Sequence, residues 1–269
     1  MSDVMDKKYF FLSGLFRSGN TVLSSILNQN PTLYVSPLSP VVEYMWQCHS
    51  FDFEPSKIKL NENRQKKVVS KIIKNFYEDV DRPVIIDRNK TWANPDNLYM
   101  IKEYISNNPK IIFTIRPLEE RVVSMINVLK NRLLLDMKID NFLYDTCISE
   151  NDNIAEYLLK GNFCALERFA YSSYIQEKNN KNIHLVKYED LLKTPTEVLN
   201  NIYNFLEIDS FTHDFNNIKK IEEDLSDEVE STKELHKIKN TLKNNSLVLS
   251  DFLSEKMIEK CKETNLFYN

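Results

Sequence analysis

Short apolar runs alternate with longer amphipathic segments along most of this chain. The short runs predict buried strands at Tyr9–Ser13, Val84–Asp87, Lys110–Ile115 and Ile183–Lys187. These runs are nearly continuous in apolar character rather than alternating with polar residues, which is typical of strands in a parallel sheet covered on both faces. The pattern therefore predicts an α/β fold.

The longer segments predict the helices, because their apolar residues recur every three or four positions. They fall at Asn20–Asn28, Pro40–His49, Asn61–Tyr77, Asp96–Ser106, Leu118–Lys130, most of 131–180 with a break at Gly161, Thr196–Leu206 and Ser250–Thr264. We expect three layers in one domain spanning residues 1–269, with a central parallel sheet between helices. The helical segments 46–80 and 131–180 are expected beside the functional site.

The segment Gly14-Leu-Phe-Arg-Ser-Gly-Asn-Thr21 joins the first predicted strand to the first predicted helix. A strand, a glycine turn and a helix N-terminus together form an anion site, because free backbone N–H groups and the helix dipole point at the ligand. The spacing of the two glycines and the threonine matches the phosphate-binding loop motif G-x-x-x-x-G-K-[ST]. Asn20 stands where the lysine of that motif belongs, and Arg17 is the only cation of the segment. This departure favours a phosphate-bearing donor other than ATP or GTP.

Composition narrows the function classes. The 269 residues carry 35 basic and 39 acidic side chains, a net charge of −4, so no general attraction to nucleic acid is expected. The four cysteines lack C-x-x-C spacing and are expected to be reduced thiols, as in a cytoplasmic protein. No apolar run approaches the ~20 residues of a membrane span, and the N-terminus lacks a signal-peptide core.

Charged and polar residues follow each predicted strand. Arg17 comes after the first, Asp87 ends the second, Arg116 follows the third and Tyr188 the fourth. In parallel α/β sheets, ligands bind beyond the carboxyl ends of the strands. These residues are therefore expected around one site.

The loop GLFRSGNTVLSSILNQNP resembles the 5′-phosphosulfate loop of sulfotransferases that use 3′-phosphoadenosine 5′-phosphosulfate (PAPS). The resemblance implies that Arg17 stabilises the bridging oxygen, which gains negative charge as the sulfuryl group leaves. It further implies that Ser18, Gly19, Asn20 and Thr21 hold the 5′-phosphate, with hydroxyl groups and loop N–H groups as donors.

A second segment, Ile115-Arg-Pro-Leu-Glu-Glu-Arg-Val-Val-Ser124, resembles the 3′-phosphate signature of the same family. The resemblance implies that Arg116 and Ser124 bind that phosphate, since arginine can hold it in a bidentate manner and serine adds another donor. Arg121, in the same segment, is expected to face solvent.

The general base is left open between two carboxylates. Lys90-Thr91 resembles the Lys-Thr-His of cytosolic family members, in which the histidine is the base, but Trp92 occupies that position here. Sulfate transfer to a hydroxyl requires a base within hydrogen-bond reach. Asp87 is one candidate and Glu43 the other, because relatives acting on carbohydrate use a glutamate in a broadly similar place. Lys90 would contact the sulfonate or balance Asp87; a solvated surface role is the alternative.

Two later segments extend the resemblance. Lys187-Tyr-Glu-Asp-Leu-Leu192 looks like a family segment in which the tyrosine, here Tyr188, touches the adenine side of the donor. Leu235-His-Lys-Ile-Lys239 resembles a basic loop that closes over the 3′-phosphate, which would involve His236 and Lys237; a charged surface stretch is the alternative. The remaining histidines lack metal-ligand spacing, so no metal is expected.

The sequence thus predicts a sulfotransferase that moves a sulfuryl group from PAPS to a hydroxyl, or less readily an amine, and releases adenosine 3′,5′-bisphosphate. The acceptor would be a small molecule or a carbohydrate; neither it nor the oligomeric state can be read from the sequence. One alternative is a small-molecule kinase with a degenerate phosphate loop. Another is an inactive protein of this fold that binds a nucleotide or a glycan.

Overall fold

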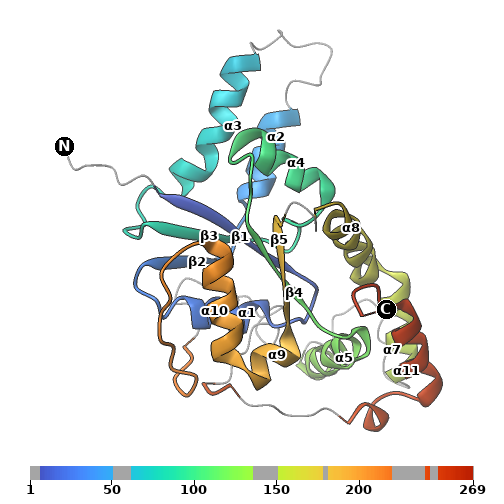
Figure 1. Cartoon of the computed structure of the whole chain (residues 1–269). Coiled ribbons are helices and arrows are strands. Elements are labelled where there is room, and N and C mark those ends of the chain that lie inside the picture. Colours follow the sequence, from blue (N-terminus) through green and yellow to red (C-terminus); the bar gives the residue numbers. More distant parts are fainter. Residues whose placement is uncertain are drawn as a thin grey trace.

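A parallel sheet forms the centre of the computed structural model, which describes residues 7–50, 62–135, 151–177, 181–219, 240–242 and 248–268 (Figure 1). Its strand order is β2-β3-β1-β4-β5, and all neighbouring pairs are parallel. The strands are β1 (Lys8–Gly14), β2 (Leu33–Leu38), β3 (Val84–Arg88), β4 (Ile111–Ile115) and β5 (Ile183–Lys187).

Four of these strands were predicted from the sequence, and β2 was not. This strand contains Pro37, which cannot donate a hydrogen bond to a neighbouring strand. The position of β2 at the edge of the sheet, paired only with β3, allows the proline to be accommodated. The register of β2 shifts between Val35 and Leu38, next to that proline.

The helices follow the predicted segments within a few residues at each end, apart from α9, which was not predicted. They are α1 (Asn20–Leu27), α2 (Val41–Ser50), α3 (Glu62–Phe76), α4 (Pro95–Tyr104), α5 (Leu118–Leu135), α7 (Asn151–Lys160), α8 (Asn162–Glu177), α9 (Tyr188–Lys193), α10 (Pro195–Leu206) and α11 (Glu255–Thr264), with a 3₁₀ turn at Leu249–Asp251. Gly161 separates α7 from α8, as the sequence predicted.

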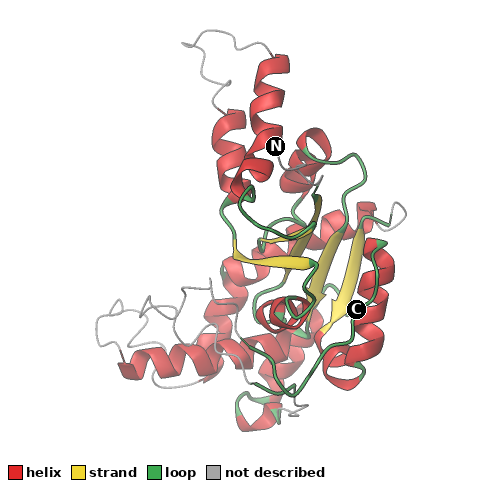
Figure 2. Cartoon of the chain, turned by 90° about the vertical axis from the view of Figure 1, so that its left-hand side faces the viewer, coloured by secondary structure: helices red, strands yellow, loops and turns green. Residues whose placement is uncertain are grey.

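Helices cover both faces of the sheet (Figure 2). Alternate strand residues point to opposite faces. Leu12 and Ile86 therefore pack with residues of α1, α9 and α10, whereas Phe11 and Ile85 pack with residues of α2, α3, α4 and α8. The three-layer α/β architecture expected from the sequence is thus confirmed.

A third apolar cluster joins α5, α7, α8 and α11 beside the sheet. Its fully buried members include Val122, Ile154 and Cys261. Within the described ranges, no helix combines the length and apolar character needed to cross a bilayer.

Candidate active site

The loop between β1 and α1 has a backbone that few sequences can adopt. Gly19, the residue before α1, has φ 89° and ψ 12°, in the left-handed region that favours glycine. A β-carbon on Gly19 would lie 2.3 Å from the Tyr188 ring, and one on Gly14 would lie 2.1 Å from Thr114 Oγ1. Arg17 also has a left-handed backbone, with φ 62°. Two of the three glycines of the chain therefore allow close approach of other residues to this loop.

Hydrogen bonds inside the loop hold it in shape. The buried Ser18 hydroxyl lies 2.6 Å from Leu15 O, to which it donates, and 2.6 Å from Thr114 Oγ1 on β4. The Asn20 amide nitrogen donates weakly to Leu15 O at 3.4 Å. The Ser18 hydroxyl is therefore hydrogen-bonded within the protein, whereas no side chain of the described residues caps the N-terminus of α1. Since the first N–H groups of a helix have no partner within the helix, those of α1 are suited to bind an anion.

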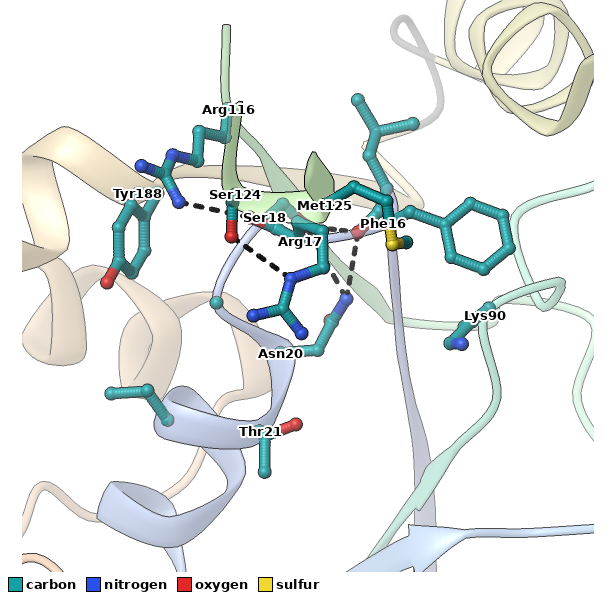
Figure 3. Close-up of a pocket in the computed structure, with 13 residues that line it drawn as sticks. Phe16, Arg17, Ser18, Asn20, Thr21, Lys90, Arg116, Ser124, Met125 and Tyr188 are labelled. Atoms are coloured by element: carbon teal, nitrogen blue, oxygen red, sulfur yellow. Dashed lines mark hydrogen bonds between the residues drawn. The ribbon is translucent and has the colours of Figure 1, made fainter. Parts of the chain in front are cut away.

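A cavity of about 280 Å³ opens beyond the carboxyl ends of the strands, over this loop (Figure 3). It brings together residues of α1, α5 and α9 and of the segments that follow β1, β3 and β4, which are far apart in the sequence. Its lining is Leu15, Phe16, Arg17, Ser18, Gly19, Asn20, Thr21, Val22, Lys90, Arg116, Ser124, Met125 and Tyr188. The lining includes three cations and, among the described residues, no carboxylate, so the cavity is suited to an anionic ligand.

Arg17 and Arg116 meet at one wall of this cavity. Arg17 Nε donates to Ser124 Oγ at 3.1 Å, and Arg116 Nη1 donates to the carbonyl oxygen of Arg17 at 3.4 Å. Burial and the nearby Arg116 guanidinium lower the pKa of Arg17, while Tyr188 opposes this effect. An anion placed between the two guanidiniums would relieve their mutual repulsion.

Arg116 is oriented by two further groups. Its Nε donates to Glu120 Oε2 at 2.9 Å, an ion pair between residues four apart at the start of α5. Its guanidinium carbon lies 4.7 Å from the centre of the Tyr188 ring. Ser124, predicted to bind the 3′-phosphate with Arg116, and Tyr188, predicted to touch the adenine side of the donor, line the same cavity as Arg116.

Lys90 lies across the cavity from Arg116, as Figure 3 shows. Its ammonium is 4.5 Å from the centre of the Phe16 ring. Burial lowers the pKa of Lys90, and the positive charges of Arg88 and Arg17 lower it further. A bound anion would offset these charges and favour the protonated lysine.

Asp87 lies in the core rather than in the cavity. It has no exposed surface, and its carboxylate accepts hydrogen bonds from Ser39 Oγ at 2.6 Å, Tyr77 OH at 2.6 Å and Trp92 Nε1 at 2.7 Å. Burial raises the pKa of Asp87, and the three donors act in the opposite direction. Trp92, which stands at the family's histidine position, is itself fully buried.

Glu43 is exposed, in the first turn of α2. Asn89 Nδ2 lies 3.3 Å and 3.4 Å from its two carboxylate oxygens and also donates to Ser39 O at 2.8 Å. Asn89 is buried and directly precedes Lys90, so it links the start of α2 to the segment that enters the cavity. Sequence reasoning did not identify Asn89.

Other residues also escaped sequence reasoning. Phe16 and Met125 line the cavity without a chemical signature of their own. The four-residue spacing between Arg116, just before the predicted helix, and Glu120, in its first turn, was the signal that could have revealed their ion pair. The predicted contributors His236 and Lys237 lie outside the described residues.

Arg121 was expected to face solvent, and this expectation is wrong. The side chain is completely buried, and it forms an ion pair with Glu167 of α8. Its Nε also donates to Arg116 O at 3.0 Å. The local sequence gives no sign of this, because Glu167 lies 46 residues away along the chain.

Comparison with known families shows which family the chain belongs to. A family model described as the sulfotransferase domain matches residues 7–265. The chain belongs to the sulfotransferase family. No curated protein sequence matches it.

Solved sulfotransferase structures share its P-loop-like fold. The sulfotransferase domain of the Synechococcus PCC 7002 olefin synthase has 17% identity, a TM-score of 0.52 and coverage of 96% of this chain and 94% of its own. Mouse sulfotransferase SULT7A1, solved with adenosine 3′,5′-bisphosphate (PAP), has 16% identity, a TM-score of 0.52 and coverage of 96% and 82%. Retinol dehydratase, solved with androsterone and PAP, has 14% identity, a TM-score of 0.52 and coverage of 97% and 80%. At these identities the likeness concerns the fold alone.

Proposed function

We propose that this sulfotransferase transfers a sulfuryl group from PAPS to a hydroxyl group of a small-molecule acceptor. The observation that carries the proposal is the cavity lined by Arg17, Lys90 and Arg116, to which the described part of the chain contributes no carboxylate. Two cations at one wall and Lys90 across the cavity match a donor with two separate anionic groups better than a single phosphate. PAP in structures of the same fold supports a PAPS-type donor.

The residues of the cavity fit such a donor. The free N–H groups at the start of α1 and the Thr21 hydroxyl would hold the 5′-phosphate, with Ser18 and Gly19 shaping the loop. Ser124 Oγ accepts from Arg17, which leaves its own proton for the 3′-phosphate beside Arg116. Tyr188, held against Gly19 and Arg116, would contact the adenosine.

The donor supplies an activated sulfuryl group. The sulfur–oxygen bond to the 5′-phosphate breaks as a bond forms from sulfur to the acceptor oxygen. Arg17 and Lys90 would stabilise the negative charge that collects on the departing phosphate and on the sulfonate oxygens. Both side chains line the same cavity, Arg17 from the β1–α1 loop and Lys90 from the segment after β3 (Figure 3).

Glu43 is the base that we propose for the acceptor proton. It is the exposed member of the two candidate carboxylates, and Asn89 holds it beside the segment that carries Lys90. Asp87 already accepts three hydrogen bonds and has no exposed surface, so an acceptor hydroxyl cannot reach it. We assign Asp87 a structural role that anchors α2 through Ser39.

Calorimetric titration with PAP, beside ATP with Mg²⁺, tests the donor. We expect micromolar binding of PAP that is strongly weakened but still measurable in Arg116→Ala, and an acceptor screen with PAPS would follow. Binding of ATP–Mg²⁺ with indifference to PAP would instead identify a kinase. Tight PAP binding with no transfer to any acceptor would favour a protein that only binds the nucleotide.

A further inference from the structure

Arg121 is a fully buried cation near the positive end of the α5 dipole. It lies in the first turns of α5, where the positive end of the helix dipole disfavours a cation. Its Nη1 has no hydrogen-bond partner among the described residues. The helix itself therefore gives no reason for an arginine at this position.

Arg121 contacts both α8 and the backbone of Arg116. Its Nη2 forms the ion pair with Glu167 Oε2 on α8, and its Nε donates to Arg116 O at 3.0 Å. Glu167 Oε1 in turn accepts from Leu266 N, after α11, at 3.4 Å. Arg121 thus connects the backbone of Arg116 to two elements outside the cavity.

Stability alone does not account for the pair. Removing both charges of a buried ion pair in favour of well-packed apolar residues is often neutral or stabilising, whereas removing one partner is strongly destabilising. A role that an apolar pair could not supply would account for its presence. Among the described residues, Arg121 contacts the cavity lining through the carbonyl oxygen of Arg116, to which an apolar side chain could not donate.

Arg116 is held from two sides as a result. Glu120 and Tyr188 contact its guanidinium, whereas Arg121 binds its backbone just after the end of β4. A bidentate contact to a phosphate depends on the direction of the guanidinium plane, which a shift of the backbone would turn.

We propose that Arg121, paired with Glu167, is a positioning residue that fixes the backbone of Arg116 and directs its guanidinium to the 3′-phosphate of the donor. This inference rests on the proposed function, because it assumes a ligand with a 3′-phosphate. It concerns affinity for that phosphate and not the transfer step.

The test compares PAP with adenosine 5′-monophosphate, which lacks the 3′-phosphate. The variants are Arg121→Lys, which keeps the charge opposite Glu167 but loses the fork geometry, and Arg121→Met combined with Glu167→Leu, which removes both charges. Thermal melting establishes that each is folded, and calorimetry gives both dissociation constants. We expect the preference for PAP to fall about tenfold in both, with the monophosphate affinity unchanged.

Arg116→Ala provides the control that separates positioning from general support of the fold. In an Arg116→Ala background, Arg121→Lys should leave PAP affinity unchanged, because the residue through which it acts is gone. A full preference for PAP in either folded variant would overturn the inference, as would an equal loss for both ligands. A wild-type protein that binds the two nucleotides equally would contradict the proposed function itself.

Discussion

Arg116, just after β4, extends into the cavity, whereas Asp87, near the end of β3, points into the core. Both residues come at the carboxyl end of a central strand, yet their surroundings differ. Arg116 lies beside Arg17 and Ser124 on what we call the donor side, where charged groups face the cavity. On the β3–α2 side, comprising Asp87, Asn89 and Glu43, the Asp87 carboxylate is fully paired with buried donors.

The difference shows that a position at the carboxyl end of a strand does not by itself place a side chain in the ligand cavity. Asp87 is on the same face of the sheet as Ile85, beneath α2 and α3, because β3 continues to Arg88. Arg116 comes after β4 has ended and is free to turn outward. The face of the strand and the place where it ends decide which residue can meet a ligand.

The largest effect is expected on the donor side, for Arg17→Ala. Loss of this guanidinium should lower kcat by about 10²- to 10³-fold, because in the proposed mechanism it stabilises charge that develops only during transfer. PAP binding, measured by calorimetry, should weaken much less. Arg17→Lys is the matched control and should keep part of the activity. Equal losses in turnover and in PAP affinity would assign Arg17 to ground-state binding instead.

On the β3–α2 side, Glu43→Gln and Asp87→Asn should separate catalysis from stability. Glu43→Gln should lower kcat by roughly 10²-fold and leave the melting temperature unchanged, because it removes only the exposed base. Asp87→Asn should cost about 1–3 kcal/mol of unfolding free energy, because the amide cannot accept all three hydrogen bonds. Steady-state kinetics measure kcat, thermal melting gives the melting temperature, and denaturant unfolding gives the free energy of unfolding.

The pH–rate profile decides between the two carboxylates. If Glu43 is the base, the acidic limb of kcat should disappear in Glu43→Gln and persist in Asp87→Asn. A folded Asp87→Asn protein without activity, beside an active Glu43→Gln protein, would reverse the assignment.

The donor side could be predicted from the sequence because its signals are local. The loop from Gly14 to Thr21 and the pair Arg116 and Ser124 each lie within one short segment, and the order of strands and helices brings the segments together. The parallel three-layer fold followed from the apolar pattern in the same way. Among the strands in the described part of the chain, only β2 was missed, since Pro37 is compatible with an edge strand but not typical of one.

The surroundings of Asp87 and Arg121 could not be predicted, because they depend on contacts between residues far apart in the sequence. Asp87 is bound by Ser39 and Tyr77, which lie 48 and 10 residues away along the chain. Arg121 looked like part of the polar face of a helix next to Glu120, and its partner Glu167 belongs to a different helix. Burial of a charged side chain by packing between elements leaves no periodic signal in the sequence.

The smallest effect is expected where the two sides meet, at Lys90. Because burial and the charges of Arg88 and Arg17 lower the pKa of Lys90, it should lose its proton below the ordinary lysine value as pH rises. The kcat/KM of the wild type should therefore fall on an alkaline limb that begins below about 10.4. Lys90→Arg should stay charged through this range, with activity near neutral pH reduced only a few-fold.

The alkaline limb should consequently move to higher pH in Lys90→Arg, and pH–rate profiles of both proteins measure the shift. The sign follows from the direction of the pKa shift: the protonated amine is the form that attracts the donor, so activity is lost as pH rises. Arg17 is present in both proteins, so an alkaline limb that stays in place in Lys90→Arg would belong to another group. That outcome would show that Lys90 does not contribute to donor binding. Arg17 and Arg116 would then be the cations of the cavity lining that attract the donor.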